Sequence, residues 1–302
     1  MIAPKVFYIP QKVDYVVVSD MFAEDYPGGA ELTLEALMSK APGQVYKLHS
    51  QLVTTELIEN HKEKVWIIGN FSQMSKTSLI ELVASGVKFF VIECDYKYCK
   101  HRSSHLHKLQ EKQECNCHTQ QHGIFVRALY QRAQKVFFMS EAQMNEYVHL
   151  FPQAKPNNFI VQSSTFKDET LDKLKELREL RKTRKPNERW AIMSGGSWIK
   201  AERATIEWCE SKGLEYDLIG GLTHSSFLEK LSTMKGLVFR PAGYDTCPRL
   251  VIEAKLLGLE LELNDNVQHK DESWFSGSIN CTEKYLKDRT KFFWDKVNEK
   301  DI

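Results

Sequence analysis

Short apolar runs alternate with longer segments of helical period along most of the chain, and this alternation constrains the fold more than any other feature. In the first half, runs rich in β-branched and aromatic residues predict strands over residues 15–19, 65–69, 87–92 and 135–139. Helices are predicted over residues 30–39 and 75–85. The pattern is typical of parallel sheets with crossover helices. Because ligands bind at the carboxyl ends of such strands, we expect chemistry near residues 19–31 and 93–102.

A second series of alternating elements follows a polar interval. Strands are predicted over residues 189–193, 216–220, 236–239 and 260–263, with helices over residues 200–212, 226–231 and 248–257. The length of 302 residues suits two such domains. A charged helical segment, residues 171–185, is interpreted as a connector with a solvated face, although its basic end could contact phosphates. The last helix, expected to begin at a capping Thr282, carries an aromatic face that must be buried.

Composition and charge exclude several classes of protein. Hydrophobic residues make up 42% and charged residues 27% of the chain, as in ordinary globular proteins. The formal net charge of +1 gives no overall field for binding nucleic acid or a membrane surface. Neither a signal peptide nor an apolar run of about 18 residues is present, so we expect a cytoplasmic protein, in the host cytoplasm if a phage encodes it. The seven cysteines then indicate thiols or metal ligands rather than disulfides.

Two glycine-rich turns precede predicted helices. Gly28 and Gly29 would let a ligand approach a helix N-terminus, where a phosphate fits, although Pro-Gly-Gly is also a common turn. The second turn, residues 195–200, reads GGSWIK and ends in Lys200, whose ammonium would add a charge for a diphosphate. Its spacing matches neither a P-loop nor a dinucleotide fingerprint, so ATPase and dehydrogenase functions are less favoured.

The most specific motif is the segment RPAGYDTCPRLVIEAK, residues 240–255. It places Asp245 in a loop and Glu253 eight residues later, on the first turns of a helix. A loop carboxylate could accept hydrogen bonds from a sugar, and a buried carboxylate could hold a ribose. The alternative is an ordinary amphipathic helix in which Glu253 pairs with a lysine.

The order of GGAE, SWIK and DTCPRLVIE resembles the retaining family-4 glycosyltransferases of GT-B fold, in a branch found in bacteria and phages. The family usually has glutamate where Asp245 stands and Lys-Gly where Lys200 and Ala201 stand. The resemblance implies an α/β fold with two Rossmann-like domains facing a cleft and a C-terminal helix returning to the N-terminal domain. Residues 1–165 plus 283–302 would form the acceptor domain, and residues 166–282 the nucleotide-sugar donor domain.

The resemblance also assigns roles to residues. Catalytic roles fall to Lys200, Asp245 and Glu253, which would bind the diphosphate, the transferred sugar and the ribose. The remaining donor-site residues would be Gly28, Gly29, Ser197, Thr246, Cys247, Pro248 and Arg249, with Arg249 a further candidate for neutralising the leaving group. Base choice would depend on the loop 220–224. Aspartate in place of glutamate retracts the carboxylate at position 245 by about 1.5 Å, so sugar choice could differ.

The implied function is transfer of a sugar from a nucleoside-diphosphate sugar to a hydroxyl acceptor, with retention and without a catalytic metal. The acceptor could be a saccharide, a lipid-linked molecule or a modified DNA base. One alternative is a transferase acting on hydroxymethylated bases of phage-type DNA, for which the basic run 178–185 and the loop 97–112 would form the groove. Another is a non-catalytic nucleotide-sugar-binding partner subunit.

A cluster of cysteine and histidine adds a metal hypothesis. Four of the seven cysteines and five of the ten histidines lie between residues 94 and 122. Thiolate and imidazole suit a structural zinc ion, and the expected ligands are Cys99, Cys115, Cys117 and His118. At the start of this segment, the residues that follow a strand end are acceptor-site candidates, unless they form an exposed loop: Asp95, Tyr96 and Lys97.

Overall fold

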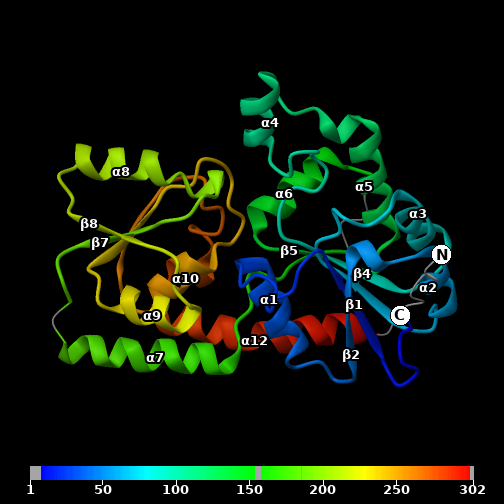
Figure 1. Cartoon of the computed structure of the whole chain (residues 1–302), viewed down its shortest axis with the longest axis horizontal. Coiled ribbons are helices and arrows are strands. Elements are labelled where there is room, and N and C mark those ends of the chain that lie inside the picture. Colours follow the sequence, from blue (N-terminus) through cyan, green and yellow to red (C-terminus); the bar gives the residue numbers. More distant parts are fainter. Residues whose placement is uncertain (1–7, 154–157, 185, 300–302) are drawn as a thin grey trace, which may run out of the picture.

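The computed structural model describes residues 8–153, 158–184 and 186–299, which form two parallel β-sheets (Figure 1). Outside the described residues lie Lys185, which ends the predicted basic run, and the terminal residues 1–7 and 300–302 of the expected acceptor domain. The first sheet has six strands in the order β2-β1-β3-β4-β5-β6. They are β1 Tyr15–Ser19, β2 Val45–His49, β3 Val65–Ile68, β4 Phe89–Glu93, β5 Val136–Phe138 and β6 Phe159–Val161.

Helices cover both faces of the six-stranded sheet. Alternate strand residues, such as Val17 and Phe90, pack with α1 (Gly29–Met38) on one face. The residues between them, such as Val16 and Phe89, pack on the other face with α2 (Thr55–Asn60), α3 (Lys76–Ala84), α5 (Gln121–Arg132) and α6 (Glu141–Leu150). The central strands β1 and β4 are buried along their whole length, which explains their continuous apolar sequence.

The second sheet has four strands in the order β10-β9-β7-β8. These are β7 Trp190–Met193, β8 Tyr216–Ile219, β9 Gly236–Phe239 and β10 Glu260–Leu263. One face packs on α9 (His224–Ser232) and α10 (Arg249–Leu256), and the other packs on α8 (Glu202–Ser211). The chain thus forms two Rossmann-like domains, as expected.

Two long helices connect the domains. The helix α7 (Asp168–Thr183) follows the first domain, and its leucines Leu171, Leu174 and Leu177 are buried in an apolar cluster that includes residues of the second domain. Arg181 donates to the carbonyl oxygens of Ser232 and Met234, and Arg178 donates to that of Leu256. These two arginines are therefore engaged within the protein, and the phosphate contact considered for them is unsupported.

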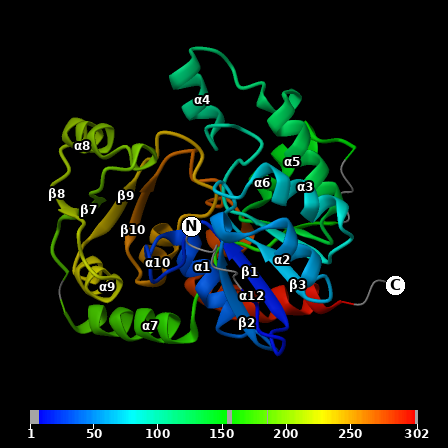
Figure 2. The same cartoon turned by 45° about the vertical axis from the view of Figure 1, so that its right-hand side comes forward.

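The helix α12 (Ile279–Asn298), preceded by α11 (Ser273–Ser276), runs from the second domain back to the first (Figures 1 and 2). It begins three residues before the predicted Thr282, because the Ser278 side chain caps it by accepting a bond from the Cys281 amide. On the first domain, Trp294 Nε1 donates to the Leu37 carbonyl at 2.8 Å. The aromatic face finds its burial site there, and the expected return of the helix is confirmed. No described helix is long and apolar enough to cross a membrane.

Candidate functional site

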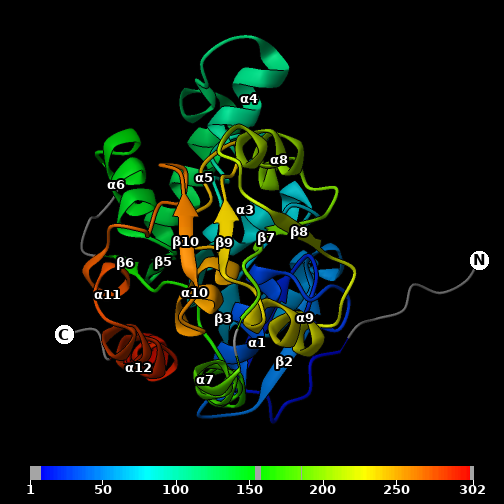
Figure 3. The ribbon, with the colours of Figure 1, turned by 90° about the vertical axis from the view of Figure 1, so that its left-hand side faces the viewer.

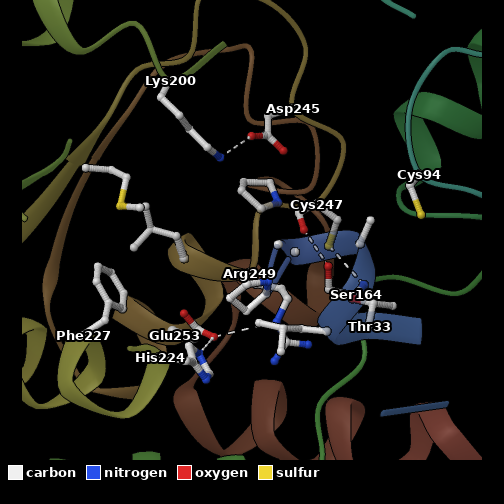
Figure 4. A pocket seen from close by; sticks show the side chains of 18 of the residues that line it. Thr33, Cys94, Ser164, Lys200, His224, Phe227, Asp245, Cys247, Arg249 and Glu253 are labelled. Carbon is white, nitrogen blue, oxygen red and sulfur yellow. Dashed lines mark hydrogen bonds and ion pairs between the residues drawn. The ribbon is translucent and has the colours of Figure 1, made fainter. Parts of the chain in front are cut away.

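A cavity of about 350 Å³ lies between the two domains (Figure 4). The first domain contributes residues 26–30 at the start of α1, with Cys94 after β4. The second contributes the loop 220–222, residues 245–250 and the side chains of Met193, Lys200, His224, Phe227 and Glu253. The structure therefore brings these predicted residues to one cavity: Gly28, Gly29, Lys200, Asp245, Thr246, Cys247, Pro248, Arg249 and Glu253.

Two helices begin at this cavity without a side-chain cap. Gly28 is the N-cap of α1 and Pro248 is the N-cap of α10, and neither helix start receives a side-chain hydrogen bond. Uncapped N-termini present free N–H groups and the positive end of the helix dipole. A Cβ atom at Gly28 would lie 2.4 Å from Glu31 Oε2, so a larger residue there would have to displace the Glu31 side chain, whereas Gly29 has ordinary space. The cavity thus suits an anionic ligand.

Lys200 and Asp245 form an ion pair at the cavity, with 3.2 Å between Nζ and Oδ2 (Figure 4). Lys200 ends a short 3₁₀ turn, Trp198–Lys200, and Ala201 follows in the left-handed region at φ 49°. That conformation favours glycine, which is the residue expected there from the resemblance. The Asp245 backbone is fixed by Asn266, whose carbonyl accepts the Asp245 amide at 2.8 Å. The two charges neutralise each other.

Glu253 is 3% exposed, and its Oε1 lies 2.9 Å from His224 Nε2. Among the described residues no lysine pairs with Glu253, because His224 at the start of α9 occupies that position. Arg249 Nε lies 3.8 Å from the same carboxylate oxygen. His224 was foreseen only as part of the loop 220–224. Its partnership with a residue 29 positions away has no local sequence signal.

The Arg249 guanidinium faces the junction between the domains. It donates to the Thr165 carbonyl and stacks on Phe166, with 3.9 Å between the guanidinium carbon and the ring centroid. Burial lowers the pKa of Arg249 to about 10, although the Glu253 carboxylate opposes this shift. Its charge is thus engaged in the protein. Nearby, the Thr246 hydroxyl donates to the Cys94 carbonyl at 2.9 Å and joins the loop that carries Asp245 to the first domain.

The second glycine-rich turn contributes only Lys200 to the cavity. Gly195 and Gly196 are exposed, and Ser197 does not line the cavity. The Gly195 amide donates to Glu202 Oε2 at 2.9 Å, so a carboxylate occupies the position where the sequence suggested a phosphate.

The three acceptor-site candidates lie outside the cavity lining. Tyr96 and Lys97 are 1% and 4% exposed, so neither side chain can reach an acceptor in this structure. Lys97 Nζ instead bonds to Glu93 at 3.0 Å and to Asp95 at 3.3 Å. Burial opposes ionisation of Asp95, but Lys97 and Arg102 hold the pKa of this carboxyl below its ordinary value. Asp95 also pairs with Arg102 and remains partly exposed.

The cysteine and histidine cluster forms, but with a different histidine from the expected one. Ligand atoms of Cys99, His107, Cys115 and Cys117 all lie within 4.8 Å of one another. The expected fourth ligand, His118, is not among them, because its ring packs against the edge of Tyr98. The prediction of His118 is therefore wrong. Although His118 is next to Cys117 in the chain, its ring does not reach the thiols.

The two basic segments considered for DNA binding lie at opposite ends of the molecule. The loop 97–112, which contains α4 (Ser104–Glu111), stands at the top of Figure 3, and α7 lies at the bottom. They cannot line one groove, so the structure contradicts that part of the DNA-transferase alternative.

No protein-family model and no curated protein matches the sequence. Solved structures match the fold. HepE from Anabaena, in complex with UDP and glucose, has a TM-score of 0.53 and 12% identity, with 94% of this chain and 97% of that chain covered. The chain has the GT-B fold. A UDP-N-acetylglucosamine 2-epimerase from Rickettsia bellii has a TM-score of 0.50 and 9% identity, with 93% and 88% covered. At these identities, the similarity concerns the GT-B architecture alone.

Proposed function

We propose that the chain is a glycosyltransferase that moves a sugar from a nucleoside-diphosphate sugar to a hydroxyl acceptor. The observation that carries the proposal is the interdomain cavity, which collects two uncapped helix N-termini, Lys200 and the carboxylates of Asp245 and Glu253. The names of two proteins of similar fold support a nucleotide-sugar ligand. HepE was solved with UDP and glucose, and the other neighbour is named for a UDP-sugar. Residues 166–282 would bind the donor, and residues 8–165 with 283–299 would bind the acceptor.

Each charged group then has a role. A bound diphosphate would compete for Lys200, whose Nζ is now 3.2 Å from Asp245. Asp245, released from this pair, would accept hydrogen bonds from hydroxyls of the transferred sugar. Glu253 would accept bonds from the ribose with the oxygen that His224 leaves free. Asp95 remains an acceptor candidate because it is partly exposed. Ser197, which was predicted at the donor site, is assigned no contact with the donor because it does not line the cavity.

The transfer needs a stabilised leaving group more than a protein nucleophile. The bond between the anomeric carbon and the diphosphate oxygen breaks, and the acceptor oxygen bonds to that carbon. The acceptor proton passes to the departing diphosphate, on the same face when configuration is retained, as in the family-4 enzymes that the sequence resembles. Lys200 and the N-termini of α1 and α10 would stabilise the negative charge that develops on the diphosphate.

Turnover with a panel of nucleoside-diphosphate sugars tests the proposal. Saccharides, lipid-linked acceptors and hydroxymethylated DNA would each be supplied, and both the released nucleotide and the product would be identified. Asp245→Asn should reduce turnover about 10- to 150-fold, the equivalent of a charged hydrogen bond worth about 1.5–3 kcal/mol, while UDP binding persists. Asp265→Asn, at a nearby exposed carboxylate, is the control.

Two outcomes would overturn the transferase proposal, and a third would overturn the role of Asp245. Nucleotide binding without turnover of any donor would indicate a non-catalytic binding subunit. Conversion of the donor sugar to its epimer without an acceptor would indicate an epimerase. Equal turnover by the parent protein and Asp245→Asn would remove Asp245 from the site.

A further inference from the structure

We propose that Cys99, His107, Cys115 and Cys117 bind one Zn²⁺ ion, which holds α4 in place above the interdomain cavity. Three thiols and one imidazole form a donor set that zinc accepts in structural sites. Cys99, His107 and Cys117 are buried and Cys115 is half-buried, so a bound ion would be shielded from water. This inference rests on the cluster alone and does not depend on the proposed transferase activity.

The distances in the cluster match the edges of a zinc tetrahedron. His107 Nδ1 lies 3.4 Å from Cys117 Sγ and 3.8 Å from Cys99 Sγ. Zinc bonds of about 2.3 Å to sulfur and about 2.0–2.1 Å to nitrogen, at tetrahedral angles, separate sulfur from nitrogen by about 3.6 Å. These two sulfur–nitrogen distances therefore lie close to those of a zinc tetrahedron, and all four ligand atoms lie within 4.8 Å of one another. Little rearrangement is needed for a metal to enter.

The segment that carries these ligands has little apolar core of its own. Of the eight residues of α4, only His107 is buried, and Leu109 is 54% exposed. The helix projects beyond the six-stranded sheet at the top of Figure 1. A helix this short is not stable without tertiary contacts. His107 is directed at the three thiols, so a metal at this point would supply the missing attachment.

The same helix contacts the second domain beside Asp245. The His105 ring lies edge-on to Tyr244, with 4.4 Å between ring centroids. A Cβ atom at Gly243 would lie 2.9 Å from His105 Cβ, so the two backbones approach closely. At the other end of the segment, Arg102 pairs with Asp95 of the first domain. An ion in the cluster would therefore fix one bridge between the domains, next to the loop that carries Asp245.

Metal content and cobalt spectroscopy test the zinc site. The full chain would be purified under reducing conditions with zinc supplied, and zinc per chain would be measured by mass spectrometry. We expect one zinc per chain in the parent protein, loss of most of it in His107→Gln, and full retention in His118→Gln. Because His107→Gln could fail to fold, the unaltered chain is also reconstituted with Co²⁺, which should show a thiolate-to-cobalt charge-transfer band.

Four results would overturn the zinc site. These are less than about 0.1 zinc per chain with no cobalt band, equal zinc in both histidine variants, loss of zinc in His118→Gln alone, and a disulfide between cluster cysteines in the reduced preparation. Cys209→Ser, at a buried cysteine outside the cluster, controls for nonspecific loss of a thiol and should keep its zinc.

Discussion

Replacing Glu253 by glutamine removes the charge of the carboxylate that we assign to the ribose and keeps its volume. The side chain is buried at 3% exposure, with His224 at 2.9 Å and Arg249 at 3.8 Å. The carboxylate oxygen that His224 leaves free would accept hydrogen bonds from the vicinal hydroxyls of the ribose. Glutamine offers only one acceptor oxygen without charge, so the effect of the substitution should depend on the ribose hydroxyls.

The expected loss follows from the strength of charged hydrogen bonds. Such bonds contribute about 1.5–3 kcal/mol, which corresponds to a roughly 10- to 150-fold increase in the Kd of UDP. A ligand that lacks one hydroxyl has already lost part of this interaction. The parent protein should therefore discriminate between UDP and 2′-deoxy-UDP more strongly than Glu253→Gln does.

Isothermal titration of both nucleotides into both proteins completes a double-mutant cycle. Glu229→Gln, at an exposed position of α9, is the matched control and should bind like the parent protein. Thermal melting of each variant checks that the unpaired Arg249 has not unfolded the domain. If Glu253→Gln kept the parent's ratio of UDP to 2′-deoxy-UDP affinity, Glu253 would not contact the ribose.

Three further predictions concern the diphosphate, the acid sensitivity of the fold and the returning helix. Lys200→Ala should weaken UDP binding by about tenfold or more but leave uridine binding unchanged, whereas Arg203→Ala, at a 93% exposed position, should alter neither titration. Burial lowers the pKa of His269 to about 3, so its unfolded form takes up a proton below about pH 6.5 and stability falls as pH falls. Between pH 7 and 5 the free energy of unfolding of the parent protein should fall by about 2 kcal/mol more than that of His269→Phe. Urea titrations in which both proteins lose the same free energy of unfolding between pH 7 and 5 would refute this. Trp294→Ala should lower that free energy by about 3–5 kcal/mol and the exposed Lys291→Ala by less than about 0.5, as measured by the same titrations.

Much of the fold was predictable because buried parallel strands have a strong local signature. The predicted runs at residues 15–19 and 236–239 coincide with β1 and β9. The edge strands β2 and β6 were not predicted. Of the five residues of β2 only Leu48 is buried, and β6 has only three residues, so neither gives a long apolar run. The last helix begins at Ile279, earlier than predicted, because Ser278 rather than Thr282 caps it.

The site was predictable where function depends on residues adjacent in the chain. The segment 245–253 carries two carboxylates and a helix start within nine residues, which suggested either a ligand site or an ordinary amphipathic helix, and the structure places both carboxylates at the cavity. Partnerships across domains left no such pattern. His224 with Glu253, Arg249 with Thr165 and His107 with the thiols each join residues through the tertiary fold. Likewise, burial of Tyr96 and Lys97 follows from the packing around them and not from their loop position.

Direct titration of the protein with UDP, GDP, ADP and CMP tests the central claim, that the interdomain cavity binds a nucleoside diphosphate. We predict one saturable site per chain for one nucleoside diphosphate, with affinity lost in Lys200→Ala. A ligand at about 100 times its Kd should also stabilise the protein by roughly 2.7 kcal/mol. No binding of any nucleotide at millimolar concentration, or equal binding by Lys200→Ala, would contradict the account.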